Sequence, residues 1–490
     1  MKFNRIPKIF LSVFILIFIV FSACKNYLEV EPQGQLTEVN YFETSGDALL
    51  GTNAIYNIMR VAFYNEGLYP ILDIMSDDAR KGSNAGDGLS NVQPYDNFTF
   101  SATTEAHANW YTTLYQGVRR ATAVIENVPS ISMDNTLKNR YIAEARFLRA
   151  LFYLDLVRAF GPVPKITTIN PPTKVARDTS IYRTLILPDL EFAIANLPSI
   201  YPTVDAGRAT KGAAYSLRAR AALFFKDFRL AASSAKEVIN SQVYGLETDF
   251  SNAFNALGNY GKESVFEVGA VAIDAFGTGG NQYGEAQGVR GTPNRGWGFN
   301  RPSLSLIAAF EAGDPRKDKS IIFLNEELDG VTILGDPSTR DSTRDQITND
   351  LIEIECYNQK VWGTGTAVLP SWGIHRKIIR YSDVLLMAAE ALNENGESGE
   401  ALTYLNMVRK RAGVPDFQNT DQTELRNAIY RERRVELALE SQRYFDLIRT
   451  GRALSELGPL GFKANRNERF PIPQIEIDIT EGSLSQNPGW

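Results

Sequence analysis

Histidine and cysteine are almost absent from this chain of 490 residues, which contains only two of each. His107 and His375 are far apart in the sequence, and neither has the His-Glu-x-x-His spacing of a common zinc site. The chain also lacks a Gly-x-Ser-x-Gly nucleophile motif and a phosphate loop ending in Lys-Ser or Lys-Thr. We therefore predict a protein that is not an enzyme and needs no metal or cofactor. Catalysis by a pair of carboxylates is the alternative that stays open, because no spacing rule identifies such a pair among 57 acidic residues.

Long apolar runs are missing as well, apart from one near the N-terminus. Three positive charges precede a run of about 13 apolar residues, whereas a span of the bilayer needs about 20. The small pair Ser22-Ala23 follows, and this order of features predicts a secretory signal peptide over residues 1–23. Cys24 comes next, as in a bacterial lipobox, so we predict that its thiol is acylated and that residues 24–43 form a tether. A plain secretory signal is the alternative.

The second cysteine, Cys356, has no partner if Cys24 is acylated, so no intramolecular disulfide is expected. Removal of residues 1–23 takes away three positive charges and no negative ones, which changes the formal net charge from −6 to −9. This negative charge argues against nucleic acid as a ligand and against a general attraction to anionic membranes. The membrane contact that we expect is the lipid anchor.

Apolar residues recur at helical spacing along most of the remaining chain. The segments with this pattern are 48–62, 110–127, 137–160, 180–196, 210–225, 228–240, 381–393, 398–412 and 421–449. Several come in pairs with short joints, which is typical of tetratricopeptide-type helix hairpins. Residues 76–103, 274–301 and 325–376 lack the pattern and are rich in turn formers. We predict an all-α fold interrupted by these irregular stretches, because long loops in a compact protein are usually functional or disordered.

The longest predicted helix, 421–449, carries an ordered charge pattern. Arg433, Glu436, Glu440 and Arg443 fall within an arc of about 80° if the helix is continuous. Two interpretations are open. We favour an ion network that fixes how the helix packs, and the alternative is a site for an anionic ligand.

The same segment carries a family resemblance. Residues 433–449, Arg-Arg-Val-Glu-Leu-Ala-Leu-Glu-Ser-Gln-Arg-Tyr-Phe-Asp-Leu-Ile-Arg, resemble the C-terminal signature of the SusD/RagB family of nutrient-binding outer-membrane lipoproteins of Bacteroidetes. Further stretches agree with the family and lie in its order, namely 144–150, 160–164, 297–302, 380–386, 470–473 and 486–489. The resemblance therefore spans nearly the whole mature chain.

The resemblance implies an all-α fold with tetratricopeptide-type helix pairs packed beneath an irregular, loop-rich half with few short strands. We expect one compact unit with an N-terminal half over residues 44–250 and a C-terminal half over residues 251–490. The resemblance also implies a lipoprotein on the outer face of the outer membrane that forms a lid over a SusC-type TonB-dependent transporter. Such a protein captures glycans and delivers them to the transporter without performing chemistry. Capture of peptides by the same architecture and a purely structural lid are the alternatives.

A sugar ring offers an apolar C–H face and a polar rim, so its capture needs aromatic planes beside hydrogen-bonding groups. Two irregular stretches supply both, and the ligand-binding residues that we predict there are Asp77, Asp78, Arg80, Asn84, Tyr95, Tyr283, Arg295, Trp297 and Asn300. Trp297 and Asn300 also fall in a family-wide stretch, so a structural role competes for both. Calcium binding through Asp77, Asp78 and Asp87 is a further alternative, although their spacing differs from that of an EF-hand.

The remaining tryptophans are assigned by position. Trp110 begins a predicted helix and is expected in the core, and Trp490 is expected to pack the chain end. Trp362 and Trp372 lie in the irregular stretch 325–376, and both a structural and a binding role stay open for them.

Overall fold

The structure is a computed structural model that describes residues 41–65, 69–271, 282–338, 342–344, 349, 351–363 and 373–490. The predicted signal peptide, Cys24 and most of the predicted tether lie outside the described residues, as does Trp372. The lipid anchor therefore stays a prediction. Among the described helices, none is both long and apolar enough to cross a membrane.

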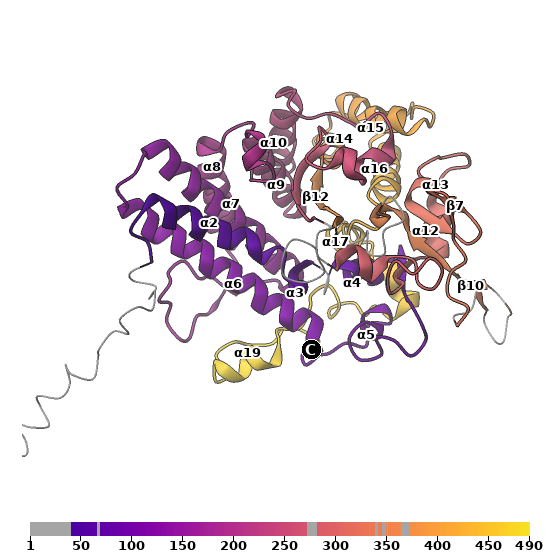
Figure 1. The fold of residues 1–490 in the computed structure, drawn as a ribbon, viewed down its shortest axis with the longest axis horizontal. Helices are drawn as coiled ribbons and strands as arrows, with labels where there is room; N and C mark the ends of the chain where they lie inside the picture. The colour runs from indigo at the N-terminus through magenta and orange to yellow at the C-terminus, as the bar shows by residue number, and fades with distance from the viewer. Residues whose placement is uncertain are drawn as a thin grey trace, which may run out of the picture.

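Helices dominate the N-terminal half and pack on one another in chain order. They are α2 (Ser45–Ile58), α3 (Ala62–Asn65), α4 (Tyr69–Ile74), α5 (Gln93–Asp96), α6 (Glu105–Asn127), α7 (Asn135–Phe160), α8 (Leu187–Asn196), α9 (Lys211–Phe224) and α10 (Phe228–Asn240). α6 packs on α7, α7 on α8, α8 on α9 and α9 on α10, as expected for stacked helical hairpins. Figure 1 shows α2, α6, α7 and α8 gathered on the left, with α9 and α10 toward the centre.

The helix ends follow from the local sequence. Thr44 is the N-cap of α2, and its backbone N–H donates to the Asp47 carboxylate at 2.7 Å in a reciprocal capping box. α7 ends at Phe160 and is capped by Gly161, whose φ of 72° lies in the range that favours glycine, and the following Pro162 cannot continue the helix. The bounds of α10 are those predicted, 228–240. Capping residues and glycine thus set these helix ends.

The C-terminal half adds a second set of helices. They are α11 (Tyr283–Gln287), α12 (Leu304–Ala309), α13 (Lys317–Ser320), α14 (Tyr381–Glu394), α15 (Ser398–Ala412), α16 (Gln422–Glu436), α17 (Arg443–Arg449), α18 (Ala453–Leu457) and α19 (Gln474–Ile479). α14 and α15 form a helical hairpin, and α14 also packs on α10 and α16. The helical stack therefore continues from one half into the other, which confirms the all-α fold class.

The strands are short and pair two at a time. They are β1 (Ala79–Gly82), β2 (Val163–Pro164), β3 (Arg177–Asp178), β4 (Ser264–Val268), β5 (Phe299–Pro302), β6 (Ile321–Phe323), β7 (Glu327–Leu328), β8 (Val331–Thr332), β9 (Ser342–Arg344), β10 (Leu351–Ile354), β11 (Cys356–Asn358) and β12 (Arg376–Arg380). Figure 1 shows β7 and β10 on the right with α12 and α13, away from the N-terminal helices on the left. This region is the loop-rich part with few short strands that the sequence predicts.

Two stretches predicted to be irregular contain short elements. Residues 76–103 include β1 and α5, and residues 274–301 include α11 and the first part of β5. None of these elements exceeds five residues, so periodicity in the sequence does not reveal them.

The prediction of a single helix over residues 421–449 is wrong. α16 ends at Glu436, and α17 begins at Arg443. Between them, Leu439 and Ser441 have φ values of 60° and 61°, a left-handed conformation that a right-handed helix cannot contain. Tertiary contacts hold this break, because the Ser441 N–H donates to the Asp73 carboxyl at 2.8 Å. Helix propensity carries no information about such a contact.

The charge pattern of this segment belongs to a buried ion network. Glu436 lies 3.0 Å from both Arg316 and Arg380, and Arg380 also pairs with Glu440 at 2.7 Å. Burial alone would raise the pKa of Glu436, but the neighbouring guanidinium groups, including Arg411, hold it far below its usual range. The structural interpretation is confirmed, although the partners lie on other elements and the four predicted residues do not share one helix face.

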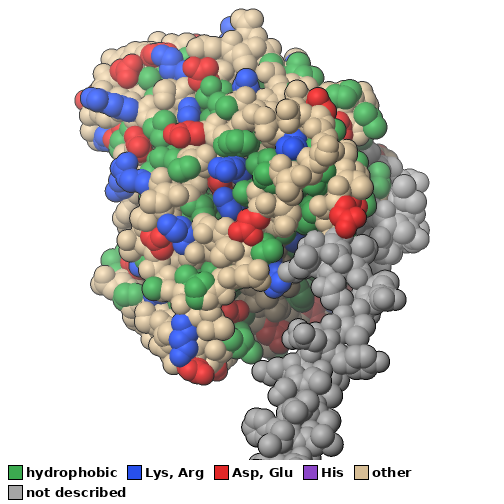
Figure 2. All heavy atoms as spheres, turned by 90° about the vertical axis from the view of Figure 1, so that its left-hand side faces the viewer, with side chains coloured by type: hydrophobic (Ala, Val, Ile, Leu, Met, Phe, Trp, Pro, Cys, Tyr) green, Lys and Arg blue, Asp and Glu red, His purple; other side chains and the backbone are tan. Residues whose placement is uncertain are grey.

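The main hydrophobic core runs through both halves of the chain, from Ala48 to Leu484. Trp110 is fully buried in it, as predicted. Trp490 packs the chain end, because its ring centroid lies 4.9 Å from that of Phe100 and its indole N–H donates to the Arg466 carbonyl at 2.9 Å. Figure 2 views the molecule from the left-hand side of Figure 1, and this face shows hydrophobic side chains scattered among charged ones of both signs.

Candidate functional site

The two stretches predicted to bind ligand lie side by side. β1 pairs antiparallel with β5, with Gly82 opposite Phe299. Next to this pair, the Ser83 N–H donates to the Gly298 carbonyl at 2.6 Å. The two stretches therefore form one scaffold, and Trp297 lies at its edge.

Close contacts fix this scaffold. Gly82 has a φ of +67°, and a Cβ there would lie 2.5 Å from the Gly298 carbonyl oxygen, so only glycine fits without displacement. Arg290 adds a second tie, because its guanidinium lies 2.6 Å from Asp87 and 2.5 Å from Asp336. The first stretch is thereby held against the second before any ligand binds.

A cavity of about 300 Å³ opens beside the scaffold, between α3, α4, the start of α6 and β5. We call it the Trp297 cavity, and the lining residues that bear on its chemistry are Phe63, Asn91, Glu105, Asn109, Trp297 and Phe299. Trp297 is 39% exposed and Phe63 is 52% exposed. Two large exposed rings at one opening are typical of a binding site rather than of ordinary surface.

Three polar side chains of the Trp297 cavity, those of Asn91, Glu105 and Asn109, have no side-chain partner among the described residues. Among the described residues, none hydrogen-bonds to the side-chain amides of Asn91 and Asn109, and none forms an ion pair with Glu105. Amide and carboxylate groups at an aromatic wall can accept and donate hydrogen bonds around a ligand whose faces are apolar. This combination suits a sugar ring.

Asp77 and Asp78 form buried ion pairs and do not line the Trp297 cavity. Asp77 accepts two hydrogen bonds from Arg443 at 2.7 and 2.8 Å, and Asp78 pairs with Arg434 at 2.7 Å. Asp87 is held by an arginine as well. The calcium alternative therefore lacks free carboxylates, and the described residues contain no group of three or more His, Cys, Asp or Glu side chains that could hold a metal ion.

Tyr95, Tyr283 and Asn300 are also buried. The Tyr95 hydroxyl lies 2.7 Å from Nδ1 of His107, and the Asn300 amide donates to Gln287 at 2.7 Å. Burial raises the pKa of the Tyr283 phenol. For Asn300 these contacts support the structural interpretation.

Arg295, Arg80 and Asn84 do not line the Trp297 cavity either. Arg295 is buried with its guanidinium 4.1 Å from the centroid of the Trp362 ring, which gives Trp362 a packing role. Arg80 and Asn84 are half-buried, and each donates a hydrogen bond within its surroundings, to the Ala79 carbonyl and to the Ser338 hydroxyl.

Trp297 is thus the member of the predicted set that lines the cavity. Phe63, Glu105 and Asn109 were not predicted, because they lie outside the two irregular stretches. Asn91 lies within the first stretch but carries no motif that would single it out. The assignment of individual ligand-binding residues stays a prediction, and its best-supported member is Trp297.

A buried carboxyl group supports the cavity from α4. Asp73 accepts hydrogen bonds from the Ser441 N–H at 2.8 Å and from the Asn300 amide at 3.3 Å. Burial raises the pKa of Asp73 to about 8, so the group is mainly protonated at neutral pH. It connects α4, whose Ile71 and Ile74 line the cavity, to β5 and to the break between α16 and α17.

The free thiol is inert. Cys356 is fully buried, and its thiol donates to the Pro302 carbonyl at 3.3 Å. Burial raises the pKa of Cys356 to about 12, so the thiolate needed for nucleophilic attack is not formed at neutral pH.

The stacked helical hairpins and the open aromatic cavity define a class, that of helical-repeat proteins with a preformed cavity beside the helical stack. Comparison with known proteins gives the family. Residues 371–490 match the family model described as the SusD family, and residues 26–223 match the one described as starch-binding associating with outer membrane. The chain belongs to the SusD/RagB family.

Individual relatives agree along the whole chain. SusD-like protein P2 of Formosa agariphila is 29% identical over 97% of this chain and 99% of its own length. A solved laminarin-binding SusD-like protein superposes with a TM-score of 0.78 at 29% identity, covering 92% of this chain and 100% of that one. Surface glycan-binding protein A of Bacteroides thetaiotaomicron, solved in complex with laminarihexaose, gives a TM-score of 0.74 at 25% identity and covers 91% of this chain and 99% of its own.

Proposed function

We propose that the protein binds oligosaccharides or polysaccharides in the Trp297 cavity and delivers them to a SusC-type TonB-dependent transporter. Membership of a family with starch-binding and outer-membrane association supports a glycan ligand, as does the likeness to laminarin- and glycan-binding proteins. The observation that carries the proposal is the cavity, in which two exposed rings lie beside amide and carboxylate groups without described partners.

Binding in this cavity uses several weak contacts. A sugar stacks its C–H face on Trp297 or Phe63, and its hydroxyls reach Asn91, Asn109 and Glu105. Each contact is modest, so they must act together. The β1–β5 scaffold positions the rings in advance, which reduces the ordering cost of binding.

The protein acts by binding alone. In the part of the chain that the structure describes, Cys356 is protonated and buried, and Asp77 and Asp78 of the first predicted stretch are held by arginines. We propose that an acylated Cys24 anchors the chain in the outer membrane with its cavity on the cell surface. The tether over residues 24–43 then allows the protein to cover the transporter and to move away from it.

Affinity electrophoresis tests the proposal. The detergent-solubilised full-length protein is run through gels that contain starch, laminarin or other polysaccharides, and a parallel assay measures binding of a peptide digest. We expect retardation by at least one glycan, normal mobility for Trp297→Ala, and retardation for Phe225→Ala, which removes a ring of similar exposure (38%) elsewhere. Binding of peptides with no retardation by any glycan would overturn the proposal in favour of peptide capture.

A further inference from the structure

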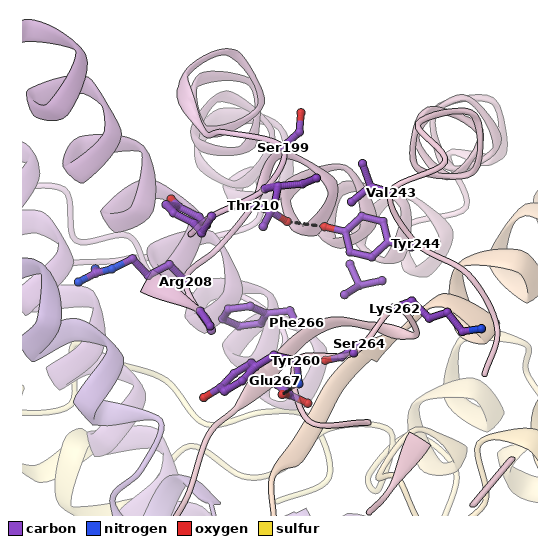
Figure 3. Close-up of a pocket in the computed structure, with 16 residues that line it drawn as sticks. Ser199, Arg208, Thr210, Val243, Tyr244, Tyr260, Lys262, Ser264, Phe266 and Glu267 are labelled. Carbon is purple, nitrogen blue, oxygen red and sulfur yellow. Dashed lines mark hydrogen bonds between the residues drawn. The ribbon is translucent and has the colours of Figure 1, made fainter. Parts of the chain in front are cut away.

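Two adjoining cavities of about 240 and 510 Å³ form a second opening, which we call the Tyr260 groove. The residues that line both cavities are Ala206, Gly207, Arg208, Tyr260 and Glu267. Figure 3 shows the smaller cavity, with the rings of Tyr244 and Phe266 on opposite sides of the space and Lys262 extending away from it.

Tyr260 is held as an exposed platform. Its φ of 53° is unusual for a residue with a large side chain, and such strain persists where the surroundings enforce it. Two glycines beside the ring, Gly207 and Gly269, leave space for it. A Cβ at Gly207 would lie 2.8 Å from the ring, and a Cβ at Gly269 would lie 2.0 Å from the Tyr260 hydroxyl. The Tyr260 N–H donates to Glu267 at 2.6 Å, and the His375 ring meets the tyrosine edge-on at 4.9 Å. The ring nevertheless stays 46% exposed.

The carboxylates of the groove are already neutralised. Glu267 forms an ion pair with Lys377 and lies 3.0 Å from Nδ1 of His375. Asp205, in the wall of the larger cavity, pairs with Arg208 at 2.8 Å and with a second arginine at 3.0 Å. Neither carboxylate therefore leaves a net negative charge that would repel an anion.

Arg60 lines the larger cavity without such a partner. No carboxylate among the described residues pairs with it, and its Nε is buried without a hydrogen bond. Its positive charge acts on Tyr260, because it opposes the rise in the pKa of the Tyr260 hydroxyl that burial causes. The amide of Asn57 in the same wall is likewise not hydrogen-bonded to a described residue. The groove thus combines an exposed ring with a cation that lacks a described counter-ion.

The groove adjoins the Trp297 cavity. Asn57, Met59 and Arg60 line the groove, and Ala62 and Phe63 line the Trp297 cavity. The corner between α2 and α3 therefore contributes to both openings. Only a few residues of the chain therefore separate the two openings.

We infer that the Tyr260 groove binds an acidic sugar residue of a bound glycan, with its ring on Tyr260 and its carboxylate or sulfate on Arg60. This inference rests on the proposed function, because the same glycan occupies the Trp297 cavity. A uronate and a sulfate ester share the required chemistry, a negative group on a pyranose ring. A glycan fits better than an acidic peptide, since both openings present exposed aromatic rings beside amides.

Isothermal titration of the detergent-solubilised full-length protein tests the inference with four probes: oligogalacturonate, a sulfated galactan oligosaccharide, laminarihexaose and hexaglutamate. We expect an acidic saccharide to bind, and Arg60→Gln to weaken that binding by about tenfold, as loss of a charge-assisted hydrogen bond implies. Tyr260→Ala weakens it as well, and Tyr260→Phe retains it. A higher salt concentration weakens binding of the acidic saccharide and leaves binding of laminarihexaose unchanged. Arg229→Gln, an equal charge change at an exposed residue of α10, is the control.

The outcomes separate the two proposals. Comparison of oligogalacturonate with the sulfated galactan oligosaccharide shows whether the groove binds a carboxylate or a sulfate ester. Glycan binding that depends on Trp297 but not on Arg60 or Tyr260 overturns the acidic-sugar inference and leaves the proposed function standing. Stronger binding of hexaglutamate than of any acidic saccharide also overturns it. Absence of binding to every saccharide overturns the proposed function itself.

Discussion

Gly82 and Gly298 meet so closely that a Cβ on Gly82 would lie 2.5 Å from the Gly298 carbonyl oxygen. The contact joins two segments that are far apart in the sequence, and Trp297 is the neighbour of Gly298. The geometry of the Trp297 cavity therefore depends on a backbone approach that only glycine permits.

Gly82→Ala tests this dependence. The methyl group meets the carbonyl oxygen, and alanine is strained at a φ of +67°. We expect a loss of about 1–3 kcal/mol in the free energy of unfolding in urea, together with weaker glycan binding. Gly86→Ala in the same loop is the control, because its Cβ would meet no atom within 4 Å. Equal unfolding midpoints for the two variants would show that the approach has no energetic importance.

Arg443→Lys tests the tie between α17 and the first predicted loop. Arg443 donates two hydrogen bonds to Asp77 at 2.7 and 2.8 Å, and both side chains are about 6% exposed. Lysine keeps the charge but cannot reproduce the paired geometry, so we expect a loss of about 1–3 kcal/mol on urea unfolding. The exposed Arg229→Lys should change stability by less than about 0.5 kcal/mol. A wild-type midpoint for Arg443→Lys would refute the structural role of the pair.

The ionisation of Glu267 is expected to make the free energy of unfolding depend on pH in the acid range. Burial alone would raise the pKa of Glu267, but the hydrogen bond with His375 and the charge of Lys377 lower it from 4.5 to about 2. A lowered folded-state pKa gives stability that is present above the unfolded value and is lost as the pH falls toward the folded value. We expect this group to contribute roughly 3 kcal/mol above pH 5 and progressively less between pH 4.5 and pH 2.

Urea unfolding of wild type and Glu267→Gln from pH 2 to pH 7 measures this contribution. The wild type should be the more stable protein at pH 7, where the variant leaves Lys377 buried without its counter-ion. The two stability curves should converge toward pH 2. Parallel curves over the whole range would assign the acid dependence to other groups.

Cys24→Ala tests the lipid anchor. Because stable anchoring requires the acyl chains, we expect the variant to carry no metabolically incorporated fatty acid and to leave the membrane fraction on washing. The same label and fractionation on the wild-type protein provide the reference. Intact-mass measurement that finds the variant acylated and retained would show that the anchor is elsewhere.

Local sequence signals located most of the long helices, although the predicted helix over residues 48–62 divides into α2 and α3. The capping box at Thr44, the glycine at Gly161 and the bounds of α10 and α15 are encoded within a few residues, so the sequence reveals them. The break at Leu439–Ser441 was missed for the opposite reason. Its left-handed backbone is held by Asp73, a residue from the other half of the chain.

The candidate site was predicted only in part. The composition of the two irregular stretches located Trp297, and the β1–β5 pairing places those stretches together. The same composition could not distinguish carboxylates that bind a ligand from those that pair with arginines, as Asp77 and Asp78 do. It also could not identify Phe63 or Asn109, which reach the cavity only through the packing of α3 and α6.

The most direct measurement of the central claim is isothermal titration of the full-length protein and its Trp297→Ala and Trp297→Phe variants with an oligosaccharide of the glycan that retards it. Loss of the ring should raise the Kd of Trp297→Ala by about tenfold or more, and Trp297→Phe should lie between that variant and the wild type. Equal Kd values for wild type and Trp297→Ala, with equal unfolding midpoints, would contradict glycan binding in the Trp297 cavity.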